Sequence, residues 1–345
     1  MLGRCDVLRM AIVGVGWAGT RQARAVRELG CKIAVECLVD SDTDHLLEKA
    51  AEMGVRKTYA NYREALADQR VDAVSICTPH ALHCQMAVEA AAEGKHVLVE
   101  KPMAMTVAEA SEMIDAARAN GVRLYVAESA VYSSMARTLR EIVRTGRHVG
   151  EMTFASVVAG FRATEYGFSG RRAWLSTPAL GGTGTWMLHG IHTVARLRYV
   201  LGEVHTVYVR QHRASSFSRT DIEGTMSGLL TLVSGVNAHV VQSPETRLRG
   251  SPRGYTIHGD RGSLRAWDEG YEVITDDGLE AYDYPPQAQS SYAEELEAFA
   301  DYVAGEASGP TTGESERRSL AVVQAGYESA ESGLPVQLSG RFGDL

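Results

Sequence analysis

The sequence predicts an α/β chain in two parts: a doubly wound parallel sheet in residues 1–128, then an α+β domain with an antiparallel sheet in residues 129–345. Three observations predict this arrangement. The length of 345 residues suits about two domains. Apolar runs alternate with helical patterns in the first part, and in the second part strand-like runs are joined by short turns.

In the first part, each apolar run is followed by a segment with helical spacing of its apolar residues. Strands are predicted at about 9–15, 32–39, 71–78, 96–100 and 122–128, and helices at about 17–29, 43–53, 83–93 and 106–120. Thr106 and Glu109 have the spacing of a capping box at the start of the last helix. Strands that alternate with helices form βαβ units with right-handed crossovers, which predicts a parallel sheet covered on both faces.

In the second part, turn dipeptides separate the apolar runs. Strands are predicted at about 151–163, 205–213, 224–233, 236–242 and 254–258, and helices near 186–200, 292–303 and 314–332. Ser234-Gly235, Gly259-Asp260 and Asp277-Gly278 are typical turn pairs.

The composition limits the kinds of partner. Hydrophobic residues make up 45% and charged residues 23% of the chain, as in ordinary globular proteins. The net charge of −8 disfavours nucleic acid and anionic membranes as partners, and favours a small molecule or another copy of the chain.

No apolar run approaches the roughly 18 residues of a membrane span. Neither a signal-peptide core nor a metal-like cysteine spacing is found, and we expect a cytoplasmic protein without a metal site. The cysteines, read as small buried side chains with a reactive thiol as the alternative, are Cys5, Cys31, Cys37, Cys77 and Cys84.

A GxGxxG pattern lies between the first predicted strand and helix. Gly14 permits the tight turn, Gly16 lets the backbone approach a pyrophosphate, and Gly19 lets helix and strand pack closely. Asp40 ends the second strand, where a carboxylate can bind both ribose hydroxyls and would repel a 2′-phosphate. The expected dinucleotide contacts in these two segments are Gly14, Gly16, Trp17, Ala18, Gly19, Asp40 and Ser41. The alternative is a glycine turn that binds no nucleotide.

Two further strand ends would meet at the same edge of the sheet. Thr78 and Pro79 could line the cofactor, and His83 either contacts it or only packs at a helix start. Glu100 and Lys101 end the next strand, and they are expected to contact the cofactor there. A lysine there is either a solvated charge or a proton donor and acceptor.

A histidine pair opens a predicted helix after a glycine-rich turn at residues 181–184. His189 and His192 lack an acidic partner for zinc, and one of them could act as a general acid or base. Two ordinary surface or core histidines fit the spacing equally well. Arg172 and Trp174 precede the turn, and they line a substrate site or belong to the core. His189 is a further expected contact of the substrate.

Together these motifs resemble the Gfo/Idh/MocA oxidoreductase family. The resemblance is carried by GVGWAG at 14–19, Asp40, CTPHALH at 77–83, GKHVLVEKP at 94–102, the GxH at 190–192 and YAEELEAFADYVAG at 292–305. It implies an N-terminal Rossmann domain and a C-terminal domain with a large, mostly antiparallel sheet, through whose open face many members form dimers or tetramers. It also implies that Lys101 and His192 are catalytic. One departure is Leu188, where members acting on inositol-like substrates carry Asp or Asn four residues before the histidine.

The expected function is therefore hydride transfer between a nicotinamide and a sugar, cyclitol or related cyclic alcohol or ketone. Lys101 is the expected main proton donor and acceptor. NAD is expected rather than NADP, since no Arg or Lys follows Asp40 within three residues. The alternatives are a dihydrodiol dehydrogenase or a redox-neutral NAD-dependent glycosidase of the same family, or a dinucleotide sensor without enzymatic activity.

Overall fold

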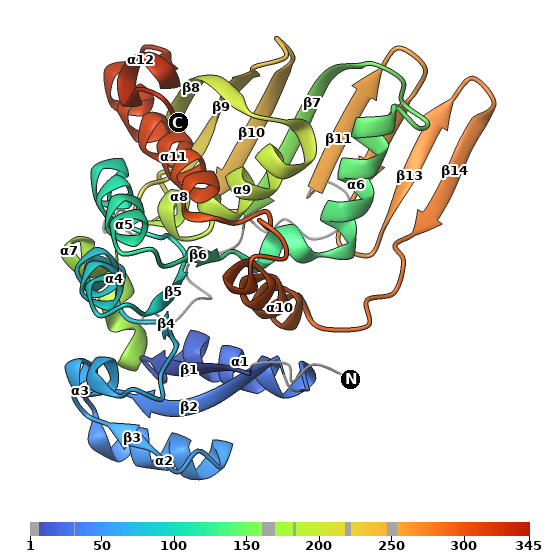
Figure 1. Ribbon diagram of the computed structural model, residues 1–345. Coiled ribbons are helices and arrows are strands. Elements are labelled where there is room, and N and C mark those ends of the chain that lie inside the picture. The colour runs from blue at the N-terminus through green and yellow to red at the C-terminus, as the bar shows by residue number, and fades with distance from the viewer. Residues whose placement is uncertain (1–6, 31, 161–169, 182–183, 218–221, 247–253) are drawn as a thin grey trace. The chain divides into compact units, whose positions relative to one another are not determined.

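The computed structural model describes residues 7–30, 32–160, 170–181, 184–217, 222–246 and 254–345 (Figure 1). Its contacts divide the chain into one unit of residues 1–129 and 288–317, and a second of residues 130–287 and 318–345. Cys5, Cys31, Gly182 and Thr183 lie outside the described residues, as does the part of the strand predicted at 151–163 beyond residue 160.

The first unit contains a six-stranded parallel sheet in the order β3-β2-β1-β4-β5-β6. Its strands are β1 (Leu8–Val13), β2 (Ile33–Val39), β3 (Thr58–Tyr59), β4 (Ala73–Ile76), β5 (His96–Glu100) and β6 (Leu124–Ala127). The strand order reverses direction at β1 and β4, so that the loops after these strands diverge at the carboxyl edge. In open α/β sheets this is where ligands bind.

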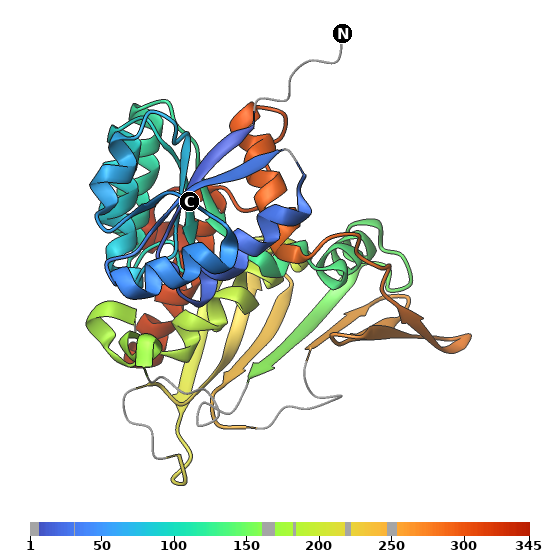
Figure 2. The ribbon, with the colours of Figure 1, turned by 90° about the horizontal axis from the view of Figure 1, so that it is seen from below.

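Helices cover both faces of this sheet (Figure 2). They are α1 (Trp17–Ala25), α2 (Thr43–Met53), α3 (Tyr62–Ala67), α4 (His83–Ala92), α5 (Val107–Ala119) and α10 (Ser291–Ala304). The apolar sides of α1, α2 and α10 share one core with β1 and β2, as expected for strands buried on both faces. The capping box predicted at Thr106 and Glu109 is formed at the start of α5.

The helix α10 packs on the first unit, although we placed all residues after 128 in the second domain. Ser290 caps α10, and both its backbone N–H and its hydroxyl donate to Glu28 at 2.9 Å. Lys32 forms ion pairs with Glu297 at 2.7 Å and Asp301 at 2.9 Å. These contacts join residues more than 260 positions apart, which local patterns cannot reveal.

The second unit contains a nine-stranded sheet in the order β14-β13-β12-β11-β7-β10-β9-β8-β15. Neighbouring strands are antiparallel except β7 and β10, which are parallel, so the sheet is mostly antiparallel as the resemblance implies. The strands are β7 (Met152–Gly160), β8 (Val204–His212), β9 (Thr225–Leu232), β10 (Asn237–Ser243), β11 (Gly254–Gly259), β12 (Ser263–Ala266), β13 (Gly270–Thr275), β14 (Gly278–Asp283) and β15 (Val336–Gln337).

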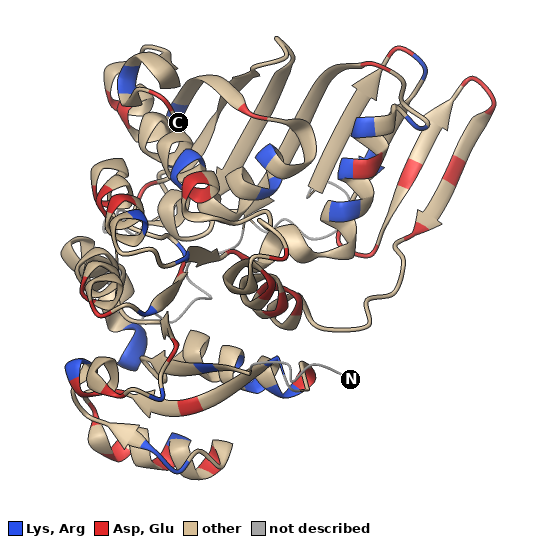
Figure 3. Ribbon diagram, viewed as in Figure 1, with Lys and Arg blue, Asp and Glu red and all other residues tan. Residues whose placement is uncertain are grey.

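The second unit also contains helices. They are α6 (Ser134–Thr145), α7 (Pro178–Gly181), α8 (Thr185–Leu188), α9 (Gly190–Leu201), α11 (Gly313–Ser332, whose first residues belong to the first unit) and α12 (Leu338–Phe342). We did not predict α6, which packs on α9 with Leu139 and Ile142 buried. Basic residues lie along its other side (Figure 3). Among the residues described, no helix is long and apolar enough to cross a membrane.

Candidate active site

The turn between β1 and α1 has the backbone that the glycine pattern predicts. Gly14 has a φ of +87°, and a Cβ there would lie 2.7 Å from the Cys77 carbonyl oxygen. A Cβ at Gly19 would lie 2.1 Å from the Gly14 carbonyl oxygen. Gly16 differs, because a Cβ there would meet no atom within 4 Å. Two of the glycines are therefore required by packing, and the third faces open space.

The N-terminus of α1 fits an anionic ligand. Gly16 is the N-cap residue, no side chain caps the helix, and its first turn contains no acidic residue. The N–H groups at a helix N-terminus and the positive end of the helix dipole attract phosphate. Trp17, at the first helical position, is 54% exposed, and the Arg21 guanidinium lies 4.1 Å from its ring centroid. These residues fit the pyrophosphate of a dinucleotide.

Asp40 follows β2 and lies beside the glycine turn. Its Oδ2 accepts the Val15 N–H at 3.0 Å, and its Oδ1 accepts the Asp42 N–H at 3.0 Å. These two hydrogen bonds fix the carboxylate between the turn and the start of α2, where Ser41 is exposed. A carboxylate in this position can accept hydrogen bonds from ribose hydroxyls.

The loops after β4 and β5 are joined through His83. Its ring is fully buried, with Nδ1 2.9 Å from the Pro102 carbonyl oxygen and Nε2 2.9 Å from the Thr78 carbonyl oxygen. Burial lowers the pKa of His83 to about 4. The structure thus places His83 between Thr78, which we predicted to line the cofactor, and the loop that carries Lys101. Both ring nitrogens of His83 face backbone oxygens.

Glu100 and Lys101 lie at the end of β5, next to β4 in the sheet. The Glu100 carboxylate is buried and accepts a hydrogen bond from the Gln22 amide of α1 at 2.8 Å. Burial raises the pKa of Glu100 to about 7, against the opposing effects of Lys101 and Gln22. Gln22 in turn accepts a hydrogen bond from Ser75 of β4, so that one buried network connects α1, β4 and the strand end before Lys101.

Sequence reasoning missed several buried polar residues of this region. Glu128 follows β6 and Glu295 lies on α10, and both are fully buried. Burial near Glu100 and Glu128 raises the pKa of Glu295 well above its usual range. The position of Glu128 after a predicted strand could have marked it. Gln22 and Glu295 have no such signal, because the residues near them in the structure are distant in sequence.

The two predicted histidines of the second unit lie at a break between two helices. We expected one helix over 186–200, but α8 ends at Leu188 and α9 begins after His189, whose φ is −116°. The expected i, i+4 relation between Leu188 and His192 on one helix face is therefore interrupted. His189 and His192 are half-buried, and Leu188 is buried. Arg172 and Trp174, both half-buried, lie in a 3₁₀ segment at Gly170–Ser176.

Glu223 is a further residue that the sequence did not indicate. Its buried carboxylate accepts hydrogen bonds from the Trp186 N–H and from the Thr185 hydroxyl, the latter at 3.2 Å, at the start of α8. Burial raises the pKa of Glu223 to about 7. Among the described residues, no group of three or more His, Cys, Asp or Glu could hold a metal ion.

Comparison with known proteins assigns the family. Residues 8–128 match the description "Oxidoreductase family, NAD-binding Rossmann fold", and residues 136–265 match the "GFO/IDH/MocA C-terminal domain". The chain belongs to the Gfo/Idh/MocA oxidoreductase family. The resemblance seen in the sequence is thus confirmed, and so is the fold class.

Named members of the family act on sugars and related compounds. The chain is 28% identical over 348 residues to 1,5-anhydro-D-fructose reductase of Ensifer adhaerens, covering 98% of this chain and 97% of that protein. It is 30% identical over 307 residues to D-xylose 1-dehydrogenase (NADP(+)) 2 of Haloferax volcanii, covering 84% of this chain and 87% of that protein. An oxidoreductase from Agrobacterium radiobacter, solved with NAD+, L-tartaric acid and magnesium, has the same fold, with a TM-score of 0.85, 24% identity, and coverage of 96% of this chain and 99% of that one.

Proposed function

We propose that the protein is an NAD-dependent dehydrogenase or reductase that acts on a CH–OH group of a sugar, cyclitol or related cyclic alcohol. One observation carries the proposal. The glycine turn with its open Gly16, the Asp40 carboxylate and the loop that carries Lys101 all lie at the carboxyl edge of one parallel sheet. Family membership and the sugar-directed relatives support the substrate class.

In this proposal, different residues bind the cofactor and act on the substrate. The N–H groups at the start of α1 bind the pyrophosphate, and Asp40 binds the adenosine ribose. A bound nicotinamide supplies the hydride acceptor or donor. In the oxidation direction, the neutral Lys101 Nζ takes the proton of the substrate hydroxyl. A hydride leaves the carbon that bears this hydroxyl, so that the alcohol becomes a carbonyl. His192 assists by hydrogen bonding to the substrate.

The preference for NAD over NADP is part of the proposal. Asp40, Asp42 and Asp44 lie close together in sequence at the β2–α2 turn, and a 2′-phosphate there would meet carboxylates instead of a cation. The relative from Haloferax volcanii is named for NADP+, so the family alone does not decide the preference.

We also propose a homodimer or homotetramer in the cytoplasm. One face of the nine-stranded sheet exposes apolar side chains, among them Phe154 at 51%, Tyr208 at 39% and Leu229 at 42%. These alternate along their strands with buried residues such as Ala155 and Leu230. An exposed apolar sheet face is typical of a subunit interface.

The function is tested by supplying NAD+ to the purified protein with sugars, cyclitols and aromatic diols. We expect NADH to form in proportion to oxidised product with at least one sugar or cyclitol. Turnover of an aromatic diol alone would indicate a dihydrodiol dehydrogenase. Product formed without net NADH would indicate a redox-neutral cycle, and tight NADH binding without any turnover would indicate a sensor.

A further inference from the structure

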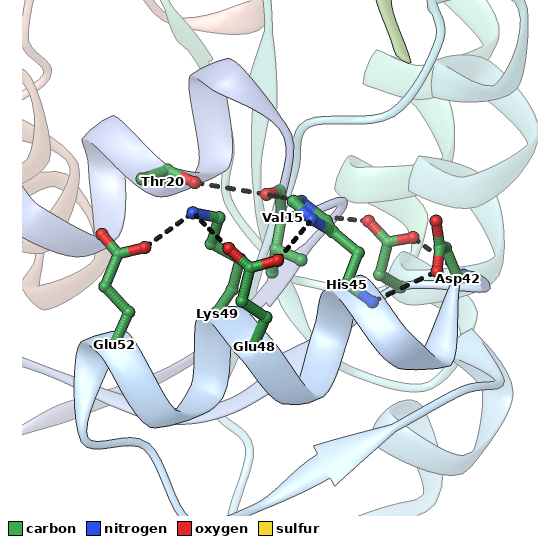
Figure 4. Close-up of polar contacts among 8 residues, drawn as sticks. Val15, Thr20, Asp42, His45, Glu48, Lys49 and Glu52 are labelled. Atoms are coloured by element: carbon green, nitrogen blue, oxygen red, sulfur yellow. Dashed lines mark hydrogen bonds and ion pairs between the residues drawn. The ribbon is translucent and has the colours of Figure 1, made fainter. Parts of the chain in front are cut away.

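The peptide groups on either side of Val15, in the middle of the glycine turn, are held by three side chains (Figure 4). The Val15 N–H donates to Asp40 at 3.0 Å. The Val15 carbonyl oxygen lies 3.2 Å from the Thr20 hydroxyl and 3.1 Å from Nε2 of His45. Since a carbonyl oxygen only accepts hydrogen bonds, His45 carries a proton on Nε2 and donates it here.

The direction of this carbonyl fixes the direction of the next N–H group. The Val15 carbonyl and the Gly16 N–H belong to one planar trans peptide, in which C=O and N–H point in opposite directions. Because Thr20 and His45 hold the carbonyl on their side, the Gly16 N–H points away from them. Gly16 is also the residue whose missing Cβ would meet no atom within 4 Å.

His45 also closes a ring of hydrogen bonds between the two turns. The Asp40 carboxylate accepts both the Val15 N–H and the Asp42 N–H, and Asp42 caps α2 by accepting the His45 N–H at 3.2 Å. The imidazole then returns to the Val15 carbonyl. The side chain of His45 is only 17% exposed, which is consistent with a fixed position.

We propose that His45 is a positioning residue for the dinucleotide. By holding the Val15 carbonyl, it aims the Gly16 N–H at the pyrophosphate and keeps the Asp40 carboxylate beside the ribose. This inference rests on the proposed dinucleotide binding. It assigns to a residue of α2, outside the glycine pattern, a role in the affinity of the pyrophosphate end of the ligand.

The test compares ligand affinities of folded variants. His45→Leu should weaken binding of NADH and of ADP-ribose about threefold to tenfold, the range for one lost hydrogen bond. His45→Gln, which keeps an N–H donor, should stay within about twofold of the wild type. In turnover assays, His45→Leu should raise KM for NAD+ while kcat at saturating NAD+ and KM for the alcohol stay unchanged, a pattern that general loss of structure would not give.

Lys49→Gln is the matched control, because Lys49 lies one turn further along α2 and pairs with Glu48 and Glu52 rather than with Val15. It should leave affinity unchanged. Equal losses in Lys49→Gln and His45→Leu would mean that the effect does not depend on the contact with Val15, and would overturn the inference. Wild-type affinity in a folded His45→Leu variant would also overturn the inference.

If His45→Leu does not fold, Thr20→Val removes the other donor to the Val15 carbonyl and must show the same selective loss of affinity. A wild-type protein that binds neither ligand would instead overturn the proposed function itself.

Discussion

Alanine at Gly16 and at Gly19 should have opposite consequences, although both glycines belong to the same turn. At Gly19 the new Cβ would lie 2.1 Å from the Gly14 carbonyl oxygen and 3.0 Å from Cγ2 of Ile12. Neither a backbone carbonyl nor a fully buried Ile12 can move aside without shifting α1 from β1. Overpacking of this kind costs about 1–3 kcal/mol of the free energy of unfolding.

At Gly16 the same methyl group meets no protein atom within 4 Å, and the φ of −72° suits any residue. Gly16→Ala should therefore be as stable as the wild type, or more stable by about 0.4–1 kcal/mol, because alanine gives the unfolded chain less conformational freedom than glycine. The methyl group would, however, occupy the approach of the pyrophosphate. We expect NADH affinity to fall about 10-fold or more, which corresponds to roughly 1.4 kcal/mol.

Urea unfolding of both variants without ligand, and fluorescence titration with NADH, measure the two effects separately. Gly16→Ala should be stable and bind poorly, and Gly19→Ala should be unstable. Wild-type NADH affinity in Gly16→Ala would refute the assignment of the open space to the pyrophosphate. Wild-type stability in Gly19→Ala would refute the packing argument.

Three further predictions concern the cofactor, pH and assembly. The wild type should bind NADH about 10-fold or more tightly than NADPH, and Asp40→Ser should reduce this difference; equal or tighter NADPH binding by the wild type would contradict the role of Asp40. Burial raises the pKa of Glu223 to about 7, so the folded state favours the protonated carboxyl group. The protonated group therefore stabilises the fold at low pH. This stabilisation is lost as the pH rises from 4.5, the pKa in the unfolded chain, through 7. Glu223→Gln should therefore be more stable than the wild type at about pH 9, by at most about 3 kcal/mol, and not at about pH 4; urea unfolding with no such difference would contradict this. Sedimentation should show a wild-type oligomer and, for Leu229→Lys on the open sheet face, a shift towards the 37.3 kDa monomer; a monomeric wild type would contradict the proposed interface.

Local patterns predicted much of the first unit. The strand at 9–15 is observed as β1 at Leu8–Val13, and the helix at 43–53 is α2. Gly14 has the positive φ of a tight turn, and Gly19 has the predicted close approach. These features depend on periodicity and on residues next to one another in the chain. The helix expected over 17–29 is shorter, because its last turn is a 3₁₀ segment at Val26–Glu28.

Contacts between distant residues could not be predicted in this way. Gln22 meets Glu100 across 78 positions and Thr185 meets Glu223 across 38, and neither pairing leaves a local pattern. The break at His189 has a similar origin, because the carboxylate that holds the start of α8 comes from a distant segment. His45 belonged to no motif, and only its contact with Val15 reveals a role.

Lys101 is proposed to carry the proton in this reaction, and this role can be tested through the kinetics of two alanine variants with an active substrate. Lys101→Ala should lower kcat about 10²–10⁴-fold, as for loss of a general acid–base, with NADH affinity little changed. His192→Ala should cost less and act mainly on KM for the substrate, because the proposed role of His192 is to hydrogen-bond the substrate. Both variants must first be shown to be folded. A larger loss of kcat in His192→Ala than in Lys101→Ala would contradict this role of Lys101 and assign the proton transfer to His192.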